Sequence, residues 1–114
     1  MKILILVNDK DAREVISFIV AEKGYEVYFG DGDIALSLIA GMAPDLMILD
    51  DWINRYRGNF CTALKDHPAT KHIPLLLLSA RLKLPQTATD CPADARLDKP
   101  FDICDLEDMI CSLV

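Results

Sequence analysis

The feature that most constrains this chain is a short apolar run that ends in two carboxylates. Residues 44–51 read Pro-Asp-Leu-Met-Ile-Leu-Asp-Asp, so the apolar run stops at Asp50 and Asp51. Runs of four to eight apolar residues bounded by turn signals are typical of a strand that is buried on both faces of a sheet. In open α/β sheets, ligands and reactions are found beyond the carboxyl ends of such strands. The pattern therefore predicts that a buried strand places Asp50 at a functional edge of a sheet.

Four other segments carry a strand pattern and complete the predicted fold. They cover residues 2–7, 25–29, 75–78 and 95–97. Helical patterns separate the strands, although Pro85 and Pro92 leave room for at most two helical turns before the last one. This alternation predicts an α/β fold, a doubly wound five-stranded parallel sheet with helices on both faces. We expect the flavodoxin-like order 2-1-3-4-5, with a degenerate fourth helix.

Capping residues predict where the helices begin and end. Asp11 and Glu14 have the spacing of a capping box, so Asp11 is expected to cap the first helix. Gly24 is expected to end that helix in the left-handed conformation, and Gly41 with Pro44 to close the second helix. The stripes expected to face the core are Ala12, Val15, Ile16, Ile19 and Val20, then Ile34, Ala35, Leu38, Ile39 and Met42, and finally Ile103, Leu106, Ile110 and Leu113.

Composition limits the class of protein. The 114 residues are long enough for one domain, residues 1–114, and an apolar content of 52% is too high for a disordered chain. The net charge of −6 argues against a nucleic-acid surface, which needs a basic stripe. No apolar run approaches a membrane span, and no signal peptide precedes the first strand. The four cysteines have neither a C-x-x-C pair nor zinc-ligand spacing, so we expect reduced thiols and a cytoplasmic protein.

Polar residues follow four of the five predicted strands. They are Asn8 and Asp9 after the first strand, Asp50 and Asp51 after the third, Ser79 after the fourth and Lys99 after the fifth. Each one alone is explained better by a turn or a helix cap than by a functional role. Because these strands are neighbours in the expected order, the residues together predict one pocket.

The residue types in that pocket fit phosphorylation of a carboxylate. Crowded carboxylates repel one another, and a bound Mg²⁺ relieves the repulsion while neutralising an incoming phosphoryl group. A carboxylate can itself be the nucleophile that forms a covalent phospho-intermediate. Lys99 supplies a positive charge for the phosphoryl oxygens, and Ser79 can donate a hydrogen bond to them. We therefore predict that Asp50 is the phosphoacceptor.

With these residues in place, the chain resembles a response-regulator receiver domain of two-component signalling. The resemblance rests on the stretches PDLMILD, HIPLLLLSA and LDKPF in combination. It implies that a histidine kinase or a phosphotransfer protein phosphorylates Asp50. It also implies that Asp9, Asp50 and the main-chain carbonyl of Trp52 hold Mg²⁺, with Asn8 contributing through a water. In this family Lys99 would contact the phosphorylated carboxylate, and Ser79 would move toward it on activation.

Three features depart from the family pattern. Asn8 stands where an acid is usual, so we expect weaker Mg²⁺ binding. Arg96 stands where an aromatic side chain usually moves on activation. The segment between Ser79 and Lys99 is shorter than usual and is interrupted by proline, so the usual output surface is expected to differ.

Two functions from different classes follow. The first is a phosphorylated receiver that is not itself an enzyme and that switches its binding to an unknown output protein, as a monomer or weak homodimer. The alternative is a pseudo-receiver, a protein-interaction module that works without phosphorylation, which Asn8 and Arg96 favour. An unrelated flavin carrier is disfavoured, because the acidic residues after the first strand would repel a phosphate.

Overall fold

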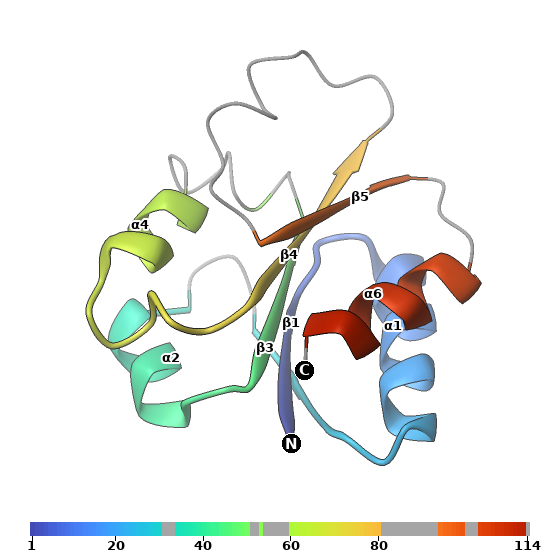
Figure 1. Ribbon diagram of the computed structural model, residues 1–114, viewed down its shortest axis with the longest axis horizontal. Coiled ribbons are helices and arrows are strands. Elements are labelled where there is room, and N and C mark those ends of the chain that lie inside the picture. The colour runs from blue at the N-terminus through green and yellow to red at the C-terminus, as the bar shows by residue number, and fades with distance from the viewer. Residues whose placement is uncertain (31–33, 51–52, 54–59, 81–93, 100–102, 114) are drawn as a thin grey trace.

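Five parallel strands form one sheet at the centre of the computed structural model (Figure 1). The structure describes residues 1–30, 34–50, 53, 60–80, 94–99 and 103–113. The strands are β1 (Lys2–Leu6), β2 (Glu26–Phe29), β3 (Leu46–Asp50), β4 (Leu75–Ala80) and β5 (Ala95–Lys99), in the order β2-β1-β3-β4-β5. The α/β fold with a parallel sheet is confirmed. The degenerate fourth helix was expected between Pro85 and Pro92, outside the described residues.

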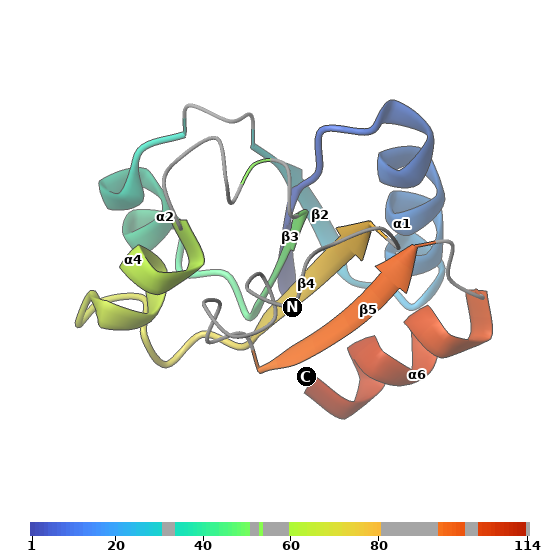
Figure 2. The same ribbon diagram turned by 90° about the horizontal axis from the view of Figure 1, so that it is seen from above.

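The four helices in the described part of the chain cover the two faces of the sheet in pairs. In Figures 1 and 2, α1 (Lys10–Glu22) and α6 (Ile103–Leu113) lie on one side, and α2 (Leu36–Met42) and α4 (Phe60–Asp66) lie on the other. None of these described helices has the length and apolar character of a membrane span.

Alternate strand residues supply the two cores. The odd-numbered residues Ile3, Ile5 and Val7 pack with α1 and α6. The even-numbered residues Leu4 and Leu6 pack with α2 and α4. Every residue of β3 is buried, as expected for a central strand covered on both faces. A strand in this position cannot be shifted by one residue without exchanging its two faces, so the place of Asp50 is fixed by the register.

The first helix is capped by a different residue from the one predicted. Asp9, not Asp11, is the N-cap of α1, and its Oδ1 accepts a hydrogen bond from the Asp11 main-chain nitrogen at 3.0 Å. The predicted left-handed Gly24 is confirmed, with φ of 83°. The predicted end of α2 at Gly41 is wrong, because the helix continues to Met42 and Ala43 takes the left-handed position with φ of 51°.

The predicted helix stripes were wider than the surface that the sheet covers. Ile16, Ile19 and Val20 of α1, Ile39 of α2 and Leu106 and Ile110 of α6 are buried as expected. Val15, Ala35, Leu38 and Ile103 are exposed, which corrects their assignment to the core. A helix that rests on a flat sheet buries about one third of its circumference, so residues at the margin of a wide stripe stay outside.

The cysteine prediction was wrong at one position. Cys104 and Cys111 keep their thiols, but Cys61 is disulfide-bonded, and its partner is not among the described residues. A disulfide between cysteines that are distant in sequence leaves no local pattern such as C-x-x-C, so no sign of it was visible in the sequence.

Two glycines offer a matched test of the backbone. A Cβ atom built at Gly24 or at Gly41 would meet no atom within 4 Å, so Ala at either position changes no packing. Gly24→Ala should lower the free energy of unfolding by about 1 kcal/mol, because Ala is strained at positive φ. Gly41→Ala should raise it by about 0.5 kcal/mol, because Gly41 is helical. Urea unfolding of both variants measures the two effects, and effects of the same sign would contradict the assignment.

Candidate phosphoacceptor site

The carboxyl ends of four strands meet at one edge of the sheet. Leu6 of β1 pairs with Leu49 of β3, and Asp50 pairs with Leu78 of β4. Further along, Ser79 pairs with Asp98, and Ala80 with Lys99 of β5. The sheet therefore places the main chains of Asp50, Ser79 and Lys99 along the same edge, where the sequence predicted one pocket.

Asp50 is a buried carboxylate whose two oxygens both accept hydrogen bonds. The residue is 1% exposed at the end of β3. Its Oδ2 accepts the main-chain N–H of Asn8 at 2.5 Å, and its Oδ1 accepts the main-chain N–H of Ile53 at 2.7 Å. A buried carboxylate needs donors that replace its lost hydration, and hydrogen bonds to an ionised acceptor are the stronger kind. Two N–H groups supplied by the main chain meet that need.

Asn8 and Asp9 follow β1, the strand next to β3, and they contribute differently at this carboxylate. Asn8 reaches Asp50 through its main chain, and its residue is exposed. Asp9 is also exposed, and one of its oxygens caps α1. The structure thus brings Asn8, Asp9 and Asp50 to one place, as predicted.

Other predicted site groups fall outside the described part of the structure. They are Asp51, Trp52 with its main-chain carbonyl, and the side chains of Ser79, Arg96 and Lys99.

The donor chemistry at this edge suits a hard cation such as Mg²⁺. The described residues contain no cluster of three or more His, Cys, Asp or Glu side chains that could hold a metal ion. Mg²⁺ does not require such a cage, since proteins commonly bind it through one or two carboxylates and keep several waters. A carboxylate has about four lone-pair positions. Among the described residues each oxygen of Asp50 accepts one N–H bond, and Asp9 offers a second, exposed carboxylate.

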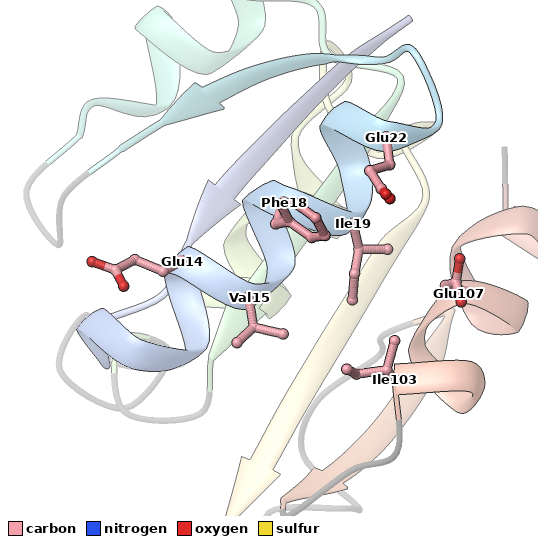
Figure 3. Close-up of a pocket in the computed structure, with 7 residues that line it drawn as sticks. All are labelled: Glu14, Val15, Phe18, Ile19, Glu22, Ile103 and Glu107. Atoms are coloured by element: carbon pink, nitrogen blue, oxygen red, sulfur yellow. The ribbon is translucent and has the colours of Figure 1, made fainter.

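A second surface feature lies between α1 and α6 (Figure 3). This α1–α6 groove has a volume of about 390 Å³ and is lined by Glu14, Val15, Phe18, Ile19, Glu22, Ile103 and Glu107. Figure 3 shows Val15 and Ile19 of α1 pointing toward Ile103 of α6. Phe18 is 67% exposed and Ile103 is 54% exposed, although both are large apolar side chains. The groove therefore exposes large apolar side chains that the described residues do not cover.

Carboxylates surround the apolar part of this groove. Glu14 and Glu22 come from α1 and Glu107 comes from α6, where it also pairs with Lys23 at 3.6 Å. That pair is exposed and contributes little to stability. Because both helices begin just after strands β1 and β5, one end of the groove lies near the edge that carries Asp50.

The groove was not predicted from the sequence, although apolar residues outside the inward stripes of α1 and α6 indicate it. Phe18 lies in α1 outside the stripe that packs on the sheet, and Val15 and Ile103 lie at the margins of their stripes. A helix whose apolar arc is wider than its contact with the sheet has apolar surface left for a partner.

The comparisons with known proteins agree with this arrangement. The family model described as "Response regulator receiver domain" matches residues 3–111. The chain belongs to that family. Response regulator MprA of Mycobacterium avium is 33% identical over 105 residues, which make up 89% of this chain and 45% of the relative. The receiver domain thus spans about half the length of the curated relatives it matches.

Solved structures show the same fold. The signal receiver domain of a signal transduction histidine kinase from Syntrophus aciditrophicus is 26% identical to this receiver domain, with a TM-score of 0.82, and the match covers 98% of this chain and 88% of that one. The chemotaxis protein CheY4 of Vibrio cholerae is 23% identical with a TM-score of 0.81 over 99% and 98% of the two chains, a likeness of fold alone.

The cap formed by Asp9 can be tested by itself. Asp9→Ala should lower the free energy of unfolding by about 1 kcal/mol, because the Asp11 N–H loses its side-chain acceptor. Asp9→Ser should stay within a few tenths of a kcal/mol of the wild type, because serine caps nearly as well. Equal losses in the two variants, measured by urea unfolding, would contradict the capping role.

Proposed function

We propose that this receiver domain is phosphorylated on Asp50 by a histidine kinase or a histidine phosphotransfer protein, and that phosphorylation switches its binding to an output protein. The observation that carries the proposal is the buried Asp50 carboxylate at the end of β3, held on both oxygens by main-chain N–H groups. The domain acts here as the acceptor in the transfer and not as an enzyme. Its cytoplasmic location stays a prediction.

The transfer moves one phosphoryl group between two heteroatoms. An Asp50 oxygen forms a bond to phosphorus while the bond between phosphorus and the donor's imidazole nitrogen breaks, and that nitrogen keeps the electron pair. The reaction depends on placing the attacking oxygen in line with the leaving group, since phosphoryl transfer is governed mainly by positioning and electrostatics. The N–H groups of Asn8 and Ile53 hold the carboxylate while leaving a lone pair for attack.

Asp9 and Asp50 would hold the Mg²⁺ that receiver domains generally bind. When bound, the cation neutralises charge on the incoming phosphoryl oxygens. Asn8 supplies a neutral amide where an acid is usual, so we expect weaker binding than a third carboxylate would give. Ser79 and Lys99 start from the same sheet edge, which supports their proposed roles toward the phosphoryl group.

The α1–α6 groove supports a docking role for the phosphodonor protein. Its side chains Val15, Phe18 and Ile103 are exposed, and one end lies near the edge that carries Asp50. Burial of Phe18 in a partner would stabilise a complex, and the surrounding carboxylates favour a partner with basic residues around an apolar patch. Docking here would bring a donor imidazole to the strand ends.

The alternative function is a pseudo-receiver that binds partners without phosphorylation. The neutral Asn8 and the Arg96 that replaces an aromatic residue favour this alternative, because Asn8 brings no charge to a cation and Arg96 cannot act as the usual aromatic switch. Mg²⁺ binding and phosphate uptake separate the two functions.

The direct test is phosphorylation by a small donor. Wild-type protein incubated with Mg²⁺ and acetyl phosphate should gain one phosphoryl group in its intact mass, because the buried carboxylate is oriented for attack. Asp50→Asn, which keeps the shape and removes the nucleophile, should gain none. Amide NMR spectra should shift with Mg²⁺ and beryllofluoride in the wild type alone. A wild-type protein that gains no phosphate and does not respond to Mg²⁺ would exclude the phosphorylated receiver and favour the pseudo-receiver.

Asp9 should affect the affinity for Mg²⁺ through its carboxylate charge and not through its role as the N-cap of α1. Asp9→Ala and Asp9→Ser should weaken Mg²⁺ binding to a similar extent, measured by fluorescence of the single tryptophan, Trp52, although only the alanine variant loses the cap. Wild-type Mg²⁺ affinity in Asp9→Ser would show that Asp9 is not a ligand.

The docking role can be separated from the chemistry by comparing two donors. Phe18→Ala should slow transfer from a histidine phosphotransfer protein by about tenfold, because an apolar anchor is lost. The rate with acetyl phosphate should not change, since that donor needs no docking. Leu38→Ala on α2 is the matched control, because Leu38 is also exposed, at 58%, but lies on the opposite face. Equal effects of the two variants would rule out the groove as the docking surface.

A further inference from the structure

Ile53 has two structural roles that meet at Asp50. Its main-chain N–H donates to Asp50 Oδ1 at 2.7 Å, and its side chain is 2% exposed. The side chain belongs to the core between the sheet and helices α2 and α4, together with Leu49, Phe60 and Ile39. Ile53 therefore links the carboxylate to that core, with its main-chain N–H on Asp50 and its side chain in the core.

The second donor to the carboxylate is held by the sheet. Asn8 lies two residues beyond β1, and β1 pairs with β3 up to Leu6 and Leu49. Its N–H is thus fixed relative to Asp50 by strand pairing. Ile53 lies three residues beyond the end of β3 and takes part in no strand pairing among the described residues. Toward the described residues, Ile53 makes the hydrogen bond to Asp50 and packs its side chain in the core.

An aspartate carboxylate needs such a fixed donor, because the torsion that turns its plane is soft. Side-chain torsions that end in a planar group have broad minima, unlike those between tetrahedral carbons. One N–H bond leaves the plane free to turn about that contact. Two N–H bonds, one on each oxygen and from different parts of the chain, define the plane.

We propose that Ile53 is a positioning residue, whose buried side chain holds its own N–H against Asp50 and so orients the carboxylate for phosphoryl transfer. This inference rests on the proposed function for its kinetic consequence. Its structural consequence, a fixed N–H bond, does not depend on phosphorylation. Misplacement of a reacting group by about 1 Å can cost a factor of about 100 in rate.

The experiment compares Ile53→Ala and Ile53→Val with Ile39→Ala and Ile39→Val. Ile39 is the matched control, because it is a fully buried isoleucine of the same core but lies on α2. Urea unfolding first establishes how far each variant is destabilised. Phosphorylation by acetyl phosphate with Mg²⁺ is then followed under conditions where all variants are folded.

We expect Ile53→Ala to slow phosphorylation by about 10- to 100-fold and Ile53→Val to restore most of the rate. Ile39→Ala should stay within about twofold of the wild type, even if it loses as much stability, because it holds no donor to Asp50. Equal slowing in Ile53→Ala and Ile39→Ala would reduce Ile53 to a general packing residue and overturn the proposal.

Amide hydrogen exchange gives a readout that does not need phosphorylation. In Ile53→Ala the amide at position 53 should lose its protection, as it should in Asp50→Ala, while Ile39→Ala should keep it. A position-53 amide that stays protected in Ile53→Ala would overturn the proposal by itself. If the wild type accepts no phosphate, the proposed function fails, and the exchange result alone decides whether Ile53 positions the carboxylate.

Discussion

A negative charge can be buried only where hydrogen-bond donors replace the water that it loses, and this constraint organises the receiver domain. Asp50 meets it with two main-chain N–H groups, from Asn8 and Ile53. Main-chain donors are placed by the fold and not by the choice of side chain. The site therefore depends on β1 lying next to β3, which brings the end of one strand against the carboxylate that the other delivers. A different strand order would leave Asp50 buried without the Asn8 donor.

The helices on the two faces of the sheet differ in how much of their apolar surface they bury. Ile39 of α2 and Leu64 of α4 are fully buried, and the core on this side also includes Ile53, whose N–H donates to Asp50. Helix α1 buries Ile16 and Val20 against the other face and exposes Phe18. The apolar surface of α1 thus continues past the sheet into the α1–α6 groove. The core that includes Ile53 and the exposed α1–α6 groove therefore lie on opposite faces of one sheet.

The strands could be predicted from the sequence because long apolar runs, such as residues 46–49, have few alternatives once they are bounded by turns. The position of Asp50 followed, since it ends such a run. The choice of N-cap residue and the width of the buried helix faces could not be predicted in the same way. Asp9 and Asp11 can both cap a helix, and the structure uses Asp9. Val15 and Ile103 fit an inward stripe by periodicity, but the width of the contact with the sheet is a tertiary property. The N–H of Ile53 has no signature in sequence, because every residue except proline carries one.

The role of Asn8 follows from the same distinction between main chain and side chain. Its departure from the family pattern replaces an acid by an amide, and the side chain is the only part that changes. The group that holds Asp50 is the Asn8 N–H, which an acid at this position would supply equally well. The substitution therefore leaves the orientation of the carboxylate intact and alters only the charge available to a cation nearby. The chain thus keeps the main-chain hydrogen bond that orients Asp50, and we expect the effect of Asn8 to fall on the affinity for Mg²⁺, toward which Asp9 would offer its exposed carboxylate.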